Sequence, residues 1–304
     1  MTLNFYDFPY DFNSERNLVA ECFLDLEQNL EESALIDIYG SYPSTRGFTR
    51  GMKYLNSRRS SRGMIDWLNI QNGFRVPIHR NAKNLWWTFE NRRPPSGIFD
   101  GTISFDLDDY ASTNFYLPLI YQYLDISGTG SSYVKHKKTI KECMVSREVT
   151  LNEKYTSKSF VSVFMNNPHP MRLRVIEELS RHGKVEIFGR FSGVYVANKL
   201  EVASKFRFNL CFENDLYPGY VTEKVLEAWL SESIPLYWGD DANKLLNPKA
   251  IVNLKDFPDV KTFIEYVVHL DNRPDLQQEI LNEPLFAKEI KYSDLKEFIF
   301  RLVS

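Results

Sequence analysis

The stretch of residues 208–239, FNLCFENDLYPGYVTEKVLEAWLSESIPLYWG, places charged residues between a predicted strand and a predicted helix. Thr222 suits the position before the helix, so Glu223 and Lys224 fall in its first turn. Free N–H groups and a positive dipole make such a terminus a phosphate site, to which Lys224 would add a full charge. Glu223 could bind a ribose diol, as the acid of a dinucleotide fold does. These residues alone favour a simpler interpretation, in which the negative charge of Glu223 interacts with the positive end of the helix dipole and Lys224 is solvated.

Arg172 presents the same chemistry in the first turn of another predicted helix, after the loop NNPHP. An arginine fork over a helix N-terminus is suited to a pyrophosphate. First-turn arginines are common, however, and Arg174 lies close by, so this signal is weak on its own.

Glu90 follows a predicted strand in LWWTFENRRPP and precedes a loop stiffened by proline. A carboxylate at the end of a strand can take a proton from a hydroxyl group that acts as nucleophile. A loop carboxylate paired with Arg92 or Arg93 explains the stretch at least as well.

Asp106 and Asp108 form an acid-x-acid pair that could chelate the divalent metal of a metal-dependent nucleotide-sugar transferase. Short acidic pairs are frequent, and the alternation of strands and helices favours a different architecture. The five histidines are scattered without ligand spacing, so we expect no metal site. The sequence also lacks a P-loop, a G-x-G-x-x-G and a H-E-x-x-H motif.

The elements that must position these residues alternate in the second half of the chain. We expect strands at residues 159–164, 185–188, 206–212 and 234–238, with helices at residues 170–182 and 222–231. Repeated βαβ units predict a parallel, doubly wound sheet. The first half is less regular, with strands expected at residues 34–39, 85–89 and 102–105. A polar segment between Asp125 and Lys158 predicts two domains, residues 1–155 and 156–304, with a cleft between them.

Composition excludes several classes of function. The 37 basic and 40 acidic residues give a net charge of -3, so no field of the whole chain attracts nucleic acid. Six basic residues occur between Arg46 and Arg62 without an acid. A solvated loop is favoured there over contact with an anionic acceptor or a membrane. Three distant cysteines favour a reducing compartment. We find neither a signal peptide pattern nor a long apolar run. We therefore expect a cytoplasmic protein without a transmembrane segment, and contact with the surface of a membrane stays an alternative.

Taken together, these residues resemble the α1,3-fucosyltransferase family. FNLCFEN, GYVTEK and IPLYWG are similar to its donor-site signature, and WWTFENRRPP followed by FDGTISFDLDDY is similar to its acceptor-domain motif. The resemblance covers most of residues 84–270. It implies a GT-B fold, in which two Rossmann-like α/β domains bind the acceptor (residues 1–155) and GDP-fucose (residues 156–304).

The resemblance also implies roles for single residues. Glu90 matches the general base of the family, Arg172 and Lys224 its pyrophosphate ligands, and a donor pocket would include three more residues: Asn214, Tyr220 and Glu223. The expected reaction transfers fucose with inversion from GDP-fucose to a GlcNAc-type hydroxyl of a glycan, in α1,3 or α1,4 linkage. No metal cofactor is required, although Mn²⁺ could stimulate. A GT-B transferase that uses another GDP-sugar, or an inactive nucleotide- or glycan-binding relative, stays an alternative.

The C-terminal residues 293–304 carry one apolar stripe of Leu295, Phe298, Ile299 and Leu302. We expect this helix to dock on the body of the protein rather than on a membrane.

Overall fold

The computed structural model describes residues 2–6, 14, 17–26, 35–40, 65–70, 74–79, 81–89, 91–94, 99–108, 112–128 and 135–304. The chain forms two compact units. The first combines Met1–Lys137 with Ile290–Ser304, and the second is Lys138–Glu289. The basic segment between Arg46 and Arg62 lies outside the described residues.

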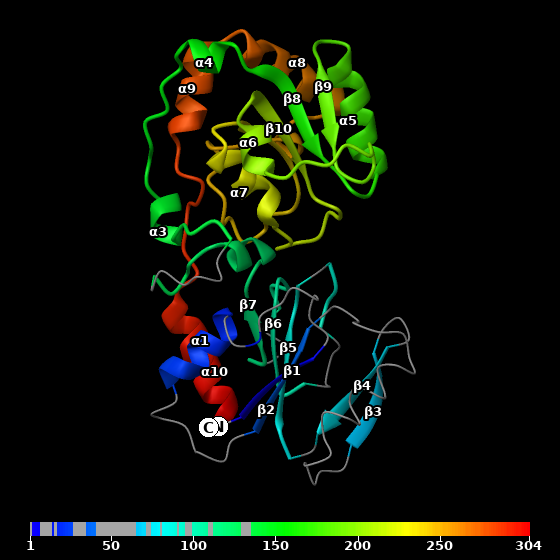
Figure 1. Cartoon of the computed structure of the whole chain (residues 1–304), viewed down its shortest axis with the longest axis vertical. Helices are drawn as coiled ribbons and strands as arrows, with labels where there is room; N and C mark the ends of the chain where they lie inside the picture. The colour runs from blue at the N-terminus through cyan, green and yellow to red at the C-terminus, as the bar shows by residue number, and fades with distance from the viewer. Residues whose placement is uncertain are drawn as a thin grey trace. The chain divides into compact units, whose positions relative to one another are not determined.

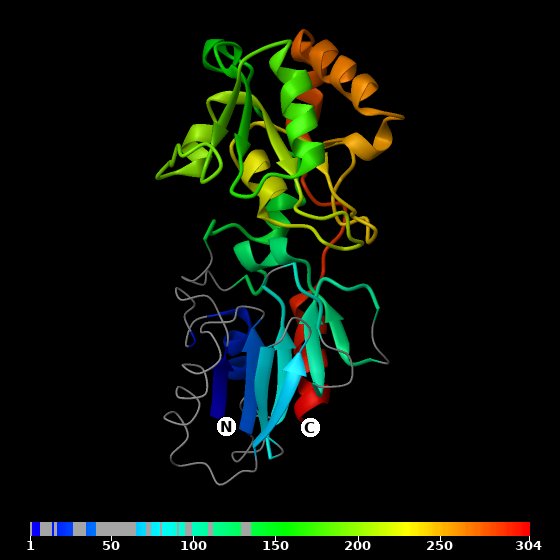
Figure 2. The ribbon, with the colours of Figure 1, turned by 90° about the vertical axis from the view of Figure 1, so that its right-hand side faces the viewer.

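The first unit is built on a five-stranded sheet in the order β1-β2-β5-β6-β7, and every neighbouring pair is parallel. Figure 2 shows these strands side by side. The strands are β1 (Thr2–Tyr6), β2 (Leu35–Gly40), β5 (Lys83–Trp87), β6 (Gly101–Ser104) and β7 (Asn114–Tyr116). The strands predicted at residues 34–39, 85–89 and 102–105 are β2, β5 and β6, with ends shifted by one or two residues. A separate antiparallel hairpin joins β3 (Ile65–Ile70) and β4 (Phe74–His79).

Two helices from opposite ends of the sequence pack together in the first unit. They are α1 (Leu18–Leu26) and α10 (Tyr292–Val303), which lie beside each other in Figure 1. Leu295, Phe298 and Ile299 of α10 are buried, and the Phe298 ring lies 5.6 Å from that of Phe115 in β7. The expectation that this helix docks on the protein body is confirmed. The 3-10 helix η2 (Leu119–Tyr123) also belongs to this unit, and its Tyr121 hydroxyl accepts a hydrogen bond from the Ile290 N–H.

The second unit contains the predicted doubly wound sheet. Its strand order is β12-β11-β10-β8-β9, and all pairs are parallel. The strands are β8 (Ser159–Phe164), β9 (Val185–Phe188), β10 (Phe206–Phe212), β11 (Ile234–Trp238) and the short β12 (Val252–Asn253). The first four match the predicted bounds. β8, β10 and β11 could be recognised because each is a nearly continuous apolar run, as strands buried on both faces are, whereas β9 is only partly buried.

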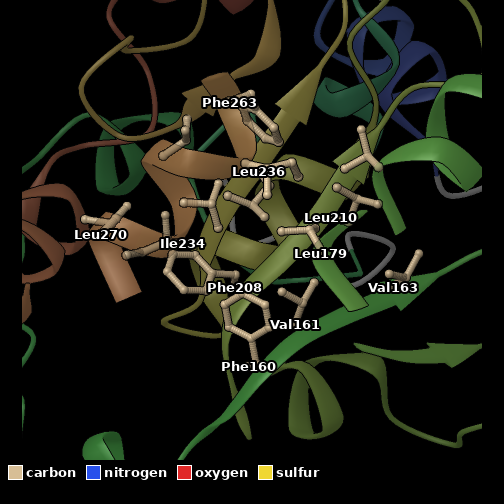
Figure 3. Close-up of a cluster of buried hydrophobic side chains, with 14 of the residues drawn as sticks. Phe160, Val161, Val163, Leu179, Phe208, Leu210, Ile234, Leu236, Phe263 and Leu270 are labelled. Atoms are coloured by element: carbon tan, nitrogen blue, oxygen red, sulfur yellow. The ribbon is translucent and has the colours of Figure 1, made fainter. Parts of the chain in front are cut away.

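Helices cover both faces of this sheet. On one face α5 (Pro170–Ser180) packs against α8 (Val260–Asp271), and on the other α6 (Lys199–Ala203) packs against α7 (Glu223–Leu230). The unit is completed by α3 (Ile140–Cys143), α4 (Glu153–Thr156), α9 (Pro274–Asn282) and the 3-10 helix η3 (Leu254–Asp256). Alternate residues of β10, Phe208 and Leu210, point into the core between the sheet and α5 with α8 (Figure 3). Leu179 and Phe263 reach the same core from these two helices.

The observed units differ from the expected domains in two places. Residues 138–155 belong to the second unit, because Val149 and Tyr155 enter its core and Arg147 donates hydrogen bonds to the carbonyl oxygens of Trp229 and Leu281. The helix α10 belongs to the first unit, whereas the predicted division grouped it with the second domain. Residues 138–155 are attached to the second unit by a few isolated buried side chains. Their sequence therefore shows no periodic apolar pattern that would predict the attachment.

We predict that Leu295→Ala in α10 lowers the free energy of unfolding by about 2–5 kcal/mol, the usual cost of a large-to-small change at a fully buried site. Glu297→Ala is the matched control, because Glu297 is exposed on the same helix and its loss should change stability by less than about 0.5 kcal/mol. Urea denaturation measures both values. Equal stabilities for the two variants would contradict the packing of α10 described above.

Candidate functional site

The charged residues predicted in the second unit lie at the carboxyl ends of β8 and β10. These strands are neighbours in the sheet although β9 lies between them in the sequence, so the winding direction of the chain reverses here. The loops that follow two such strands diverge toward opposite faces and leave room for a ligand. Residues 165–169 follow β8 and lead into α5, while residues 213–222 follow β10 and lead into α7.

Arg172 joins the ends of the two strands. It stands in the first turn of α5, whose N-terminus is capped by His169, because the His169 Nδ1 accepts from the Met171 N–H at 3.2 Å. The residue is only 3% exposed. Its guanidinium donates to the carbonyl oxygen of Asn167 at 2.9 Å, and the hydrogen-bond acceptors on the β10 side are Phe212 O, Glu213 O and Asn214 Oδ1. Burial lowers the pKa of Arg172, and the Glu213 charge opposes that shift.

Glu213 is a buried carboxylate at the centre of the β10 end. Its side chain is fully buried and accepts from the Thr222 N–H and the Thr222 hydroxyl, both at 2.7 Å, and from the Lys224 Nζ at 2.9 Å. The Lys224 ammonium also donates to Thr222 Oγ1 at 2.7 Å. Burial alone would lower the pKa of Lys224, but the charges of Glu213 and Glu223 outweigh burial and raise it, so the side chain carries a positive charge at neutral pH.

The N-terminus of α7 lies beside this network. Thr222 precedes the helix in the predicted place, yet it does not cap α7, because its hydroxyl is turned to Glu213. Glu223 and Lys224 are the first two residues of α7, as predicted, and both are partly exposed. A helix N-terminus without a side-chain cap presents unsatisfied N–H groups and the positive end of the dipole.

The loop between β10 and α7 brings two more predicted residues to the same region. Asn214 is exposed and accepts a hydrogen bond from Arg172, and the side chain of Tyr220 is buried. Gly219 bends this loop with a positive φ of 83°, and its N–H donates to the carbonyl oxygen of Asp240 beyond β11. The predicted residues of the second unit therefore lie on the loop between β10 and α7 and at the N-termini of α5 and α7.

Glu213 is a functional residue that the sequence pattern does not single out, because it lies inside the motif FNLCFEN. The available signal was a glutamate directly after an apolar strand, because carboxylates at the end of a buried strand are rarely buried without a charged partner. Lys224 is that partner.

The predicted residues of the first unit are described only in part. Glu90 lies outside the described residues. Asp106 is buried and pairs with Arg93 at 3.8 Å, whereas Asp108 is exposed. The carbonyl oxygens of both aspartates accept from the Asn114 Nδ2, at 3.0 and 2.8 Å. Within the described ranges, no group of three or more His, Cys, Asp or Glu side chains is arranged to hold a metal ion.

Two α/β units, each with a parallel sheet, and a cationic strand-end site in the second define the GT-B type of glycosyltransferase fold. Comparison with known proteins supports this fold type. Residues 152–281 match the family model described as "Glycosyltransferase family 10 (fucosyltransferase) C-term". A crystal structure of an α1,3-fucosyltransferase with GDP-fucose aligns with a TM-score of 0.68 and 22% identity, covering 99% of this chain and 90% of that one.

Two relatives were identified by sequence. An α-(1,3)-fucosyltransferase of Helicobacter pylori is 31% identical over 234 residues, which are 69% of this chain and 48% of the relative. A human 4-galactosyl-N-acetylglucosaminide 3-α-L-fucosyltransferase is 33% identical over 112 residues, 34% of this chain and 30% of the relative. Residues 152–281 thus resemble the C-terminal region of glycosyltransferase family 10. It spans about half the length of the Helicobacter pylori relative. Among the described residues, no helix has the length and apolar character needed to span a membrane.

We predict that Arg172→Ala lowers the free energy of unfolding by at least about 2 kcal/mol, because several buried acceptors lose a charged donor. Arg174→Ala, an exposed arginine of the same helix, should change stability by less than about 0.5 kcal/mol. Urea denaturation measures the difference, and an Arg172→Ala protein as stable as Arg174→Ala would contradict this role.

Proposed function

We propose that the protein is an α1,3-fucosyltransferase that transfers fucose from GDP-fucose to a GlcNAc-type hydroxyl of a glycan. The observation that carries the proposal is the pair of cations, Arg172 and Lys224, at the carboxyl ends of β8 and β10 beside the uncapped N-terminus of α7. Two cations and a helix dipole at one sheet edge suit the diphosphate of a nucleotide sugar. The names of the relatives and of the aligned structure support fucose and GDP-fucose as the sugar and its donor.

The donor would bind the second unit and the acceptor the first. The diphosphate would lie at the start of α7, where Lys224 and the helix N–H groups meet it. Glu223 and Asn214 are exposed enough to reach the hydroxyl groups of the ribose or the fucose. Arg172 is buried, so its main contribution would be to fix the two loops and to add positive potential.

The chemistry follows from these positions. In a single displacement the acceptor oxygen attacks the anomeric carbon from the face opposite GDP, which inverts the configuration. Negative charge then grows on the leaving diphosphate, where fixed cations and N–H donors stabilise it more than they stabilise the ground state. Glu90 would accept the proton of the hydroxyl as the new bond forms.

The direct test is turnover of GDP-fucose with type 1 and type 2 lactosamine acceptors. The proposal expects release of GDP together with a fucosylated product, and product analysis assigns the linkage. Turnover of another GDP-sugar instead, or binding of GDP without any product, would replace the proposal by one of its two alternatives.

We predict that Glu90→Gln lowers kcat by about 10²–10⁴-fold, the usual contribution of a general base, and leaves the affinity for GDP unchanged. The amide keeps the shape of the side chain but cannot take a proton. Steady-state kinetics and calorimetry measure the two quantities. Should Glu90 only pair with a neighbouring arginine on a solvated loop, the variant would keep more than about a tenth of the wild-type kcat.

We also predict that activity survives exhaustive chelation, because the Lys224 ammonium, the N–H groups at the start of α7 and the positive potential of Arg172 would already stabilise the leaving group. Initial rates with and without EDTA measure this. Modest stimulation by Mn²⁺ agrees with screening of the diphosphate. Loss of activity in EDTA that is restored by metal, and that Asp106→Asn reproduces, would show that the reaction depends on a metal held by the acid-x-acid pair.

A further inference from the structure

We propose that Glu213 is a positioning residue of the diphosphate site, which holds the Lys224 ammonium and the turn before α7 in the orientation that meets a phosphate oxygen. The inference rests on the proposed function, because it takes the ligand to be the diphosphate of a nucleotide.

The geometry around the carboxylate supports this role. Both carboxylate oxygens accept hydrogen bonds from the turn, Oε1 from the Thr222 N–H and Oε2 from the Thr222 hydroxyl and Lys224 Nζ. An ammonium has three N–H groups, and two of those on Lys224 are directed to Glu213 and Thr222. Within the described part of the chain, the third has no acceptor. The Lys224 side chain is 20% exposed, so this N–H group can serve a ligand.

Glu213 connects both cations of the site. Its backbone carbonyl oxygen accepts from Arg172 at 3.2 Å, while its side chain accepts from Lys224 at 2.9 Å. One residue therefore fixes the donors on the β8 side and on the α7 side with respect to each other. Buried and fully bonded, the carboxylate points away from solvent and does not compete for the place of the phosphate.

The surroundings of Glu213 leave little freedom. A Cβ atom at Gly239, the residue after β11, would lie 3.0 Å from Glu213 Cγ and 2.2 Å from the Tyr237 hydroxyl oxygen. Only glycine allows the chain to pass this close, and the glutamate is thereby confined between β11 and the start of α7.

Glu213 also keeps Lys224 charged. Burial favours the neutral amine, and the groups that oppose burial are Glu213, Glu223 and Tyr220, of which Glu213 contributes most. The thiol of Cys211 lies 3.3 Å from two acceptors of its single hydrogen, the carbonyl oxygens of Asn209 and Lys224. When Glu213 becomes neutral, the largest of the charges that oppose burial is lost and the pKa of Lys224 falls. The ammonium then loses its proton as the pH rises, and its attraction for a diphosphate is lost in the same direction.

The experiment is calorimetric titration of GDP between pH 7 and pH 9.5 into the wild type, Glu213→Gln, Glu213→Asp and Lys224→Ala. The phosphates of GDP keep their charge in this range, because the second phosphate pKa is about 6. The guanine base loses its N1 proton near the upper end of the range in every titration, so the affinity of each variant is expressed relative to the wild type at the same pH. Glu213→Gln should bind about tenfold more weakly at pH 7 and lose a further tenfold or more by pH 9.5, whereas Lys224→Ala should be weak and flat. Glu213→Asp keeps the charge and should restore the flat profile.

Glu227→Gln is the matched control. Glu227 is a buried carboxylate of α7, the helix that contains Lys224, and it pairs with a different lysine, Lys199, at 3.5 Å. It should leave the pH profile flat. A Glu213→Gln protein with a flat profile, whether its affinity is normal or reduced, would overturn the proposal, since a purely structural role predicts that result. Failure of the wild type to bind GDP would instead refute the proposed function.

A second variant keeps the inference testable if Glu213→Gln does not fold. Thr222→Val preserves the shape of the side chain but removes the hydroxyl that bonds both Glu213 and Lys224. We expect its affinity for GDP to fall by about tenfold, the effect of one lost hydrogen bond to a charged group. Wild-type affinity in Thr222→Val would contradict the positioning role.

Discussion

Burial of opposite charges at one edge of the second sheet is the constraint on which the site depends. Arg172 is almost completely covered, and it can remain there because backbone carbonyl groups beyond β8 and β10 accept its N–H groups. Glu213, at the same strand end, is neutralised by Lys224 and by two donors of Thr222. Buried charges are costly when any partner is missing, so the two loops and the start of α7 must take up their positions together.

Much of the second unit could be predicted from the sequence because its strands are buried on both faces. The runs SFVSVF and FRFNLCF are typical of core strands, and Pro170 and Gly183 mark the limits of a helix. The strands β1, β7 and β12 lacked such runs. They are short, and their pairing partners decide their conformation, which a local pattern does not reveal.

The sequence predicts which residues lie at the site, but not which of them are buried and which are exposed to a ligand. Helix N-termini after strands identified Arg172 and Lys224, since parallel strands end at one edge. Burial is a tertiary property, and the sequence therefore placed Arg172 over a ligand whereas the structure covers it. It also left Glu213 without a role. The compact units divide at residue 138 rather than near 155 for the same reason. Contacts such as that of the Arg147 guanidinium with the Trp229 ring, 3.9 Å from the ring centroid, attach a polar segment that has no apolar period.

The central claim is that a guanosine diphosphate sugar binds at the carboxyl ends of β8 and β10. Hydrogen exchange of the backbone amides, measured by mass spectrometry with and without GDP-fucose, tests it most directly. The account predicts slower exchange in residues 165–172 and 213–224, because the ligand covers these loops and holds the start of α7. Exchange that stays unchanged in both segments at saturating GDP-fucose, with slowing confined to other parts of the chain, would contradict it.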